Sequence, residues 1–177
     1  MKKISPAESV KIICNGLLHF DKKSLKKIGF NPVEYEKDVT GNMANILVQS
    51  GGINFSESQI TKIRRAILNI FKRSNFEVET VSENENNATV KVSLSVFKKF
   101  SQVDALKNLP SNVAELSESE KIDAVANILV NALNEMKIHA CFEFFADCVY
   151  EENLKMWLPA DGQKFGLTIT TKIFDFE

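Results

Sequence analysis

The sequence has few cysteines, and their number and spacing argue against a disulfide-stabilised or zinc-stabilised domain. Its three cysteines, Cys14, Cys141 and Cys148, form no C-x-x-C pair. An odd number without such pairs argues against both a disulfide framework and a structural zinc site. All three lie in apolar segments, where a free cysteine usually packs as a small hydrophobic residue. We therefore expect no metal and no cofactor.

A long hydrophobic run is also lacking. No stretch reaches the roughly 18 consecutive apolar residues that a membrane-spanning helix needs. Met1-Lys2-Lys3 resembles the start of a secretory signal, but Ile4-Ser5-Pro6 follows instead of an apolar segment. Two localisations stay open: the cytoplasm, or a membrane-anchored position outside it if a signal segment has been removed.

Net charge is small, and its distribution matters more than its sum. The chain carries a net charge of −1, yet residues 1–75 hold 13 Lys/Arg against 6 Asp/Glu, and residues 76–177 hold 9 against 17. The basic helix expected over residues 60–73 has no exposed aromatic residues between its cations, so nucleic-acid binding is disfavoured. Gly51-Gly52 follows a helix instead of preceding one, which excludes a phosphate-binding loop.

Apolar residues, by contrast, are plentiful enough for a sizeable core. The 177 residues are 44% hydrophobic and include 13 Phe, which fits one domain over residues 1–177. Residues 76–100 predict two strands joined by a polar turn, because apolar residues alternate with polar ones from Ala88 to Val96. A two-stranded ribbon with one apolar face is marginal alone, so other elements must cover that face.

The segments before this hairpin predict helices. Ser5-Pro6-Ala7-Glu8 and Ser56 with Gln59 have the pattern of helix-capping boxes, and each precedes apolar residues at helical spacing. Phe30 and Tyr35 flank the cap Asn31 and are placed for a hydrophobic staple. Gly16 interrupts the first helix, which suggests a close approach to another backbone.

The segments after the hairpin predict one more helix and further strands. Ser117–Lys137 has helical spacing, and Ile138–Tyr150 alternates as a long strand. A turn then leads into Lys155–Pro159, and Phe165–Phe176 fits either a strand or a helix. The predicted fold class is α+β: N-terminal helices packed on a curved, cone-like antiparallel sheet, with an extra helix inserted between strands.

Several motifs resemble a known superfamily. The stretch Val10–Leu25 is similar to the opening of nuclear transport factor 2-like (cystatin-like) domains, and Glu151–Asp161 resembles their C-terminal hairpin. SPAES, FSESQI and the late Trp-Leu-Pro-Ala-Asp together resemble a family of uncharacterised bacterial lipoproteins. The resemblance implies a cone-shaped fold held outside the cytoplasmic membrane. The family's lipidated cysteine is absent, and the helix Ser117–Lys137 stands where a minimal cone has none.

Four residues are candidates for lining a ligand pocket: His139, Cys141, Glu143 and Trp157. The first three share a strand face, where same-face residues lie about 6–7 Å apart, too far to hold one metal without help from other elements. The polar face of a half-exposed strand is the favoured explanation for these three, and core packing is the favoured explanation for Trp157. His19 and Asp21 could form a dyad, although Asp21 is also explained as a helix cap.

No convergent catalytic set emerges from these residues. The first hypothesis is a non-enzymatic binding domain whose concave apolar pocket takes a small apolar ligand or a peptide. The alternative is a cone-fold enzyme of isomerase or dehydratase type, with an acid or His inside the pocket. A third hypothesis is a homodimer formed through the sheet. The sequence therefore leaves enzymatic activity open, with a binding role favoured.

Overall fold

The computed structural model describes residues 4–50 and 52–173, and in this part of the chain four helices precede the first strand. They are α1 (Pro6–His19), α2 (Lys22–Lys27), α3 (Pro32–Ser50) and α4 (Glu57–Arg73). The capping boxes that start α1 and α4 are confirmed, with Ser5 bonded to Glu8 and Ser56 bonded to Gln59. Asp21 caps α2, and Gly29 follows its end with φ +88°.

The sheet has four antiparallel strands in sequence order. They are β1 (Phe76–Glu83), β2 (Asn87–Phe97), β3 (Ile138–Glu151) and β4 (Met156–Pro159). Between β2 and β3 the chain forms α5 (Gln102–Leu106), the 3₁₀ helix η1 (Val113–Glu115) and α6 (Glu118–Glu135). The expected fold class is thus confirmed: helices on a curved antiparallel sheet, with a helical insertion between strands.

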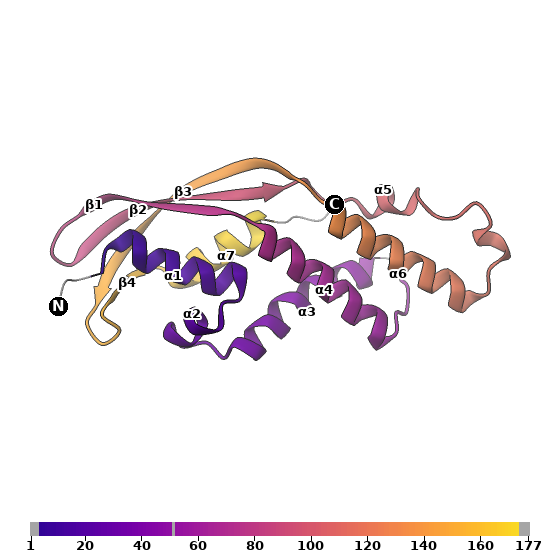
Figure 1. Cartoon of the computed structure of the whole chain (residues 1–177), viewed down its shortest axis with the longest axis horizontal. Helices are drawn as coiled ribbons and strands as arrows, with labels where there is room; N and C mark the ends of the chain where they lie inside the picture. Colours follow the sequence, from indigo (N-terminus) through magenta and orange to yellow (C-terminus); the bar gives the residue numbers. More distant parts are fainter. Residues whose placement is uncertain (1–3, 51, 174–177) are drawn as a thin grey trace.

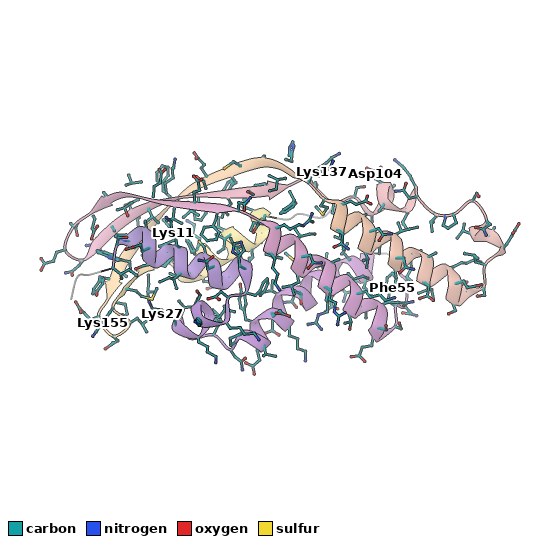
Figure 2. All side chains as sticks on the ribbon, viewed as in Figure 1. Lys11, Lys27, Phe55, Asp104, Lys137 and Lys155 are labelled. Carbon is teal, nitrogen blue, oxygen red and sulfur yellow. The ribbon has the colours of Figure 1, made fainter. Side chains whose placement is uncertain are left out.

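The apolar face of the sheet packs on the helices. Figure 1 shows the long strands arching over α1 and α7, with α3, α4 and α6 gathered toward the end where β3 begins. Among the described residues the buried side chains form one continuous cluster that runs from α1 to α7. On β2 the buried side chains are Ala88, Val90, Val92 and Leu94, which alternate as the sequence predicts, and Phe97, which follows a shift in the register with β3. Side chains fill the space between the sheet and the helices (Figure 2).

The C-terminal segment resolves an ambiguity of the sequence. Residues Gly162–Ile173 form helix α7, so the strand interpretation of this segment is wrong; Phe174–Phe176 lie outside the described residues. Asp161 accepts a hydrogen bond from the N–H of Lys164 at 2.9 Å and caps the helix. Phe165, Ile169 and Ile173 are then buried at i, i+4 and i+8, which is helical spacing. The hydroxyls of Thr168 and Thr171 donate hydrogen bonds to the carbonyls four residues earlier, as threonines on a helix do.

Gly16 supplies a test of how α1 packs on α2. A Cβ at Gly16 would lie 3.2 Å from the backbone N of Leu25, whereas one at Gly41, in the middle of α3, would meet nothing within 4 Å. We expect Gly16→Ala to lower the free energy of unfolding by about 1–3 kcal/mol, because overpacking outweighs the gain in helix propensity. Gly41→Ala should raise it by up to about 1 kcal/mol. Urea unfolding measures both, and equal stabilisation by the two variants would contradict the close approach.

The three thiols should differ in reactivity. Burial raises the pKa of Cys14 to about 12 and is the main cause that raises the pKa of Cys148 to about 11, whereas Cys141 is exposed. We expect a disulfide reagent at pH 8 to modify Cys141 rapidly in the native protein and the other two only after unfolding. Mass spectrometry of the labelled peptides identifies the site. Fast labelling of Cys14 in native buffer would contradict its buried position.

Candidate functional site

The candidate site is an apolar groove between the N-terminal helices and the C-terminal segment. It has a volume of about 400 Å³. One wall comes from α1, from α3 and from the segment that joins α2 to α3, and the other comes from the end of β4 and from α7. Its lining residues are Ile13, Leu17, Ile28, Phe30, Tyr35, Val39, Leu158, Pro159, Gly162, Gln163, Phe165, Gly166, Leu167 and Thr170. This size and composition fit a small-molecule site.

The first wall follows from the staple that the sequence predicts. The rings of Phe30 and Tyr35 lie 5.3 Å apart across the start of α3, which confirms that contact. The Tyr35 hydroxyl donates a hydrogen bond to the carbonyl of Leu17 at 3.1 Å and so holds α3 against the end of α1. Burial raises the pKa of Tyr35, so this phenol stays protonated and serves as a donor. Phe30 remains 46% exposed and presents its ring at the groove.

The second wall is one side of α7. Phe165 and Ile169 anchor the helix in the core, while Leu167 remains 56% exposed. Two glycines, Gly162 and Gly166, line the groove, and a Cβ on either would meet nothing within 4 Å. The absence of side chains at these two positions keeps the volume beside α7 open.

Polar groups in the groove are few and already engaged in part. The Thr170 hydroxyl donates to the carbonyl of Gly166 at 2.8 Å, and Tyr35 donates to Leu17. Gln163 contributes the remaining polar side chain of the described lining. Neither a carboxylate nor an imidazole occurs among these lining residues. The arrangement is therefore suited to holding apolar surface rather than to moving protons.

The residues singled out from the sequence do not line this groove. His139, Cys141 and Glu143 are exposed on the face of β3 that points away from the helices. Strand alternation explains their position, because Phe142 and Phe144 take the helix side. Glu143 accepts a hydrogen bond from the Ser93 hydroxyl and pairs with Lys91 at 3.3 Å. The hydrogen bond from Ser93 is the main cause, and Lys91 the second, that holds the pKa of the Glu143 carboxyl below its usual value.

Trp157 is fully buried in β4 and contributes to packing. Its indole N–H donates to the carbonyl of Ile4 at 3.0 Å, and its ring packs edge-on against Tyr150 at 5.4 Å. The structure thus separates Trp157 from the outward row on β3. Across the described part of the chain, no group of three or more His, Cys, Asp or Glu side chains is placed to hold a metal ion.

His19 and Asp21 do not contact each other as a dyad. The His19 ring lies 3.2 Å from the side-chain oxygen of Asn15 and 2.9 Å from the carbonyl oxygen of Ser74, joining the end of α1 to the end of α4. The Asp21 carboxylate instead accepts from the N–H of Ser24 at 2.8 Å; hydrogen bonding from Ser24 is the main cause that lowers its pKa. His19 thus joins two helix ends, and Asp21 caps the start of α2.

Sequence reasoning missed Ile28, Leu158 and Gly166 as groove residues. Phe30 and Tyr35 carried a local signal, since the staple brings them together. The α7 wall carried a weaker one, the helical spacing of Phe165 and Ile169, which competes with a strand pattern in the same residues.

Comparison with known proteins bears on the fold. No protein-family model matches the chain, and neither does any curated protein. Among solved structures, the chain is similar to the crystal structure of a putative lipoprotein, YcdA, from Bacillus subtilis, with a TM-score of 0.68 and 11% identity. The match covers 96% of this chain and 56% of that one, so the chain spans little more than half of the protein it resembles. No helix among the described residues is long and apolar enough to cross a membrane. At this identity the match establishes a shared fold and nothing more.

Proposed function

We propose that the chain is a binding domain whose groove holds the apolar body of a small molecule. The observation that carries the proposal is the groove itself: about 400 Å³, lined almost wholly by apolar side chains from four elements. Pockets of about 300–1,000 Å³ with this lining are typical of small-molecule sites. A stable protein partner would need about 1,000 Å² or more of buried surface, which makes a compact ligand the better fit.

The charge beside the groove indicates which amphiphiles would bind best. Helix α2 runs directly into Ile28, a groove residue, and exposes Lys22, Lys23, Lys26 and Lys27; Lys27 is labelled in Figure 2. A molecule with an apolar chain and an anionic head would place the head near these cations. Surface cations contribute mainly through long-range attraction, which salt weakens.

The isomerase or dehydratase alternative receives no support at this site. Such chemistry needs an acid or a histidine in the pocket. The ionisable side chain among the described lining residues is Tyr35, and its hydroxyl donates to a backbone carbonyl. The lining therefore favours binding over this kind of catalysis.

Filling the groove from α7 tests the proposal. Gly166→Leu places a side chain where a Cβ meets no atom within 4 Å, so the fold should tolerate it. We expect the affinity for the neutral fluorescent probe N-phenyl-1-naphthylamine to fall at least about tenfold, because excluding about 60 Å² of apolar contact removes about 1.5 kcal/mol. Fluorescence titration measures the affinity.

Gly41→Leu is the matched control. It makes the same change in the interior of another helix, at a position with equally open space that does not line the groove. This variant should bind the probe as the unmodified chain does. Equal affinity in all three proteins, or an absence of probe binding to any, would contradict a ligand site in the groove.

We also propose that residues 1–177 form one domain of the nuclear transport factor 2-like (cystatin-like) kind, held outside the cytoplasmic membrane by a lipid anchor. The continuous core supports one domain, and helices on a curved sheet support the kinship. The fold shared with YcdA supports the location. Sequencing the start of the gene tests the anchor: a signal segment that ends in a lipid-accepting cysteine supports it, and a start without one contradicts it.

A further inference from the structure

Strand β3 has an open edge along most of its length. Strand β4 pairs only with Cys148–Glu151 of β3, while β2 pairs with the strand from Ile138 to Val149. Among the described residues, the remainder of β3 therefore has a neighbouring strand on one side only. Such an edge offers unpaired backbone groups to another strand.

The hydrogen-bond pattern identifies which backbone groups point outward. The N–H of Tyr150 donates to the carbonyl of Asn86 at 3.2 Å, so these two residues form a hydrogen-bonded pair. Bonded and non-bonded pairs alternate in an antiparallel ladder, so the even-numbered residues Ala140–Cys148 bond to β2. The odd-numbered residues point the other way. Asp147 shows this directly: its carbonyl accepts a hydrogen bond from the N–H of Ala160 at 2.8 Å, on the side of β3 that faces away from β2.

Cys141, Glu143 and Phe145 therefore direct their N–H and C=O groups to the open edge. In the part of the chain that the structure describes, these backbone groups have no hydrogen-bond partner. Phe145 is also 65% exposed, which is unusual for so large an apolar ring. The edge thus combines unused backbone groups with exposed apolar surface.

The opposite edge of the sheet has a register shift and a helix contact that the β3 edge lacks. On β1 the register shifts between Thr80 and Ser82, and α1 reaches the strand through a hydrogen bond from the N–H of Ala7 to the Thr80 hydroxyl at 3.2 Å. From Ala140 to Cys148, β3 keeps an unbroken register with β2 and contains neither proline nor lysine. A register shift, a covering helix, a proline or a lysine are usual devices that stop a second strand from pairing with an edge.

Helix α7 leaves room beside the edge. A hollow of about 190 Å³ lies between Phe144–Asp147 of β3 and the α7 residues Lys164 and Thr168. Phe144 and Phe142 on the helix side are only half-buried. A second strand laid along β3 would cover both rings as well as the backbone groups.

We propose that two copies of this chain pair antiparallel through their β3 edges and form one continuous sheet. Two-fold pairing of outward-facing residues allows few registers. A register centred on Glu143 would put two Glu143 carboxylates directly opposite, which is unfavourable. One centred on Phe144 would need the Asp147 carbonyl, which already accepts from Ala160. A register centred on Cys141 would leave the exposed Phe145 opposite position 137, outside β3. The register centred on Phe142 avoids all three of these faults.

This register joins complementary surfaces. On the outer face Cys141 lies opposite the partner's Glu143, whose charge Lys91 already balances at 3.3 Å, and Phe145 lies opposite the partner's His139. On the helix side the opposed pairs are all apolar: Phe142 with its own symmetry mate, and Ala140 with the partner's Phe144. The apolar layer of each sheet continues into that of the other.

The first experiment removes one outward donor from the edge. Cys141→Pro deletes an N–H that does not bond to β2, so the four-stranded sheet should persist, as prolines on edge strands do. Each dimer loses two hydrogen bonds, one from each copy, so we expect the dimer dissociation constant to rise about 10- to 100-fold. Cys141→Val keeps the N–H and is the matched control. Sedimentation equilibrium gives the constants, and circular dichroism checks that each variant is folded.

The second experiment reads the register by cross-linking in the Cys141→Val background. Phe142→Cys places two thiols directly opposite in a non-hydrogen-bonded pair, about 4.5 Å apart at Cα, which suits a disulfide. Phe144→Cys places its thiols about 13 Å apart along the strands, too far for one. We expect mild oxidation to cross-link the first variant and not the second.

Several results would overturn the proposal. Unmodified protein that remains monomeric at about 100 µM excludes the dimer and leaves the edge to a foreign strand. A dimer that survives Cys141→Pro uses another surface, and a dimer that cross-links through Phe144→Cys has another register. If the proline variant is unfolded, the cross-linking pair still decides, because neither variant there alters a backbone donor.

Discussion

The structure depends on covering one apolar face of a long antiparallel sheet. Val90, Val92 and Leu94 on β2 are fully buried, and that burial is supplied by helices that come from both ends of the chain. Burying such side chains stabilises a fold by about 1.5–3 kcal/mol each, but only if the covering helices are themselves fixed. Capping boxes on α1, α4 and α6 fix where those helices begin, and the close contact at Gly16 fixes how α1 meets α2.

Local signals in the sequence predict most of these elements. Serine followed three residues later by Glu or Gln marks the start of three helices, and alternation marks β2 and β3, because each depends on neighbours in the chain. The C-terminal segment was ambiguous for the same reason. Its Thr-rich alternation fits a strand, whereas the Asp161 cap and the spacing of Phe165 and Ile169 fit a helix. In the structure the segment is a helix that buries Phe165, Ile169 and Ile173.

The candidate groove was much harder to predict than the fold. Its walls pair Leu17 and Phe30, near the start of the chain, with Leu158 and Gly166, near the end. No local pattern reports a contact between segments so far apart in sequence. The row His139, Cys141 and Glu143 has residue types that can take part in catalysis or metal binding. Strand alternation nevertheless places this row on the solvent face of β3, because phenylalanines occupy the face toward the helices. Residue type alone predicts a site here, whereas the strand geometry places these three side chains on the surface.

One change of direction links the groove to the open edge. After the four residues of β4, the chain leaves the sheet at Pro159 and enters α7 through the cap at Asp161. Had the segment continued as a strand, it would have paired with β3 from Asp147 toward Ile138 and closed that edge. As a helix it lies beneath the sheet instead, where Gly162 and Gly166 form a wall of the groove. Among the described residues, the turn at Pro159–Asp161 therefore leaves both a ligand-sized cavity and an open edge on β3, two surfaces that a fifth strand would have removed.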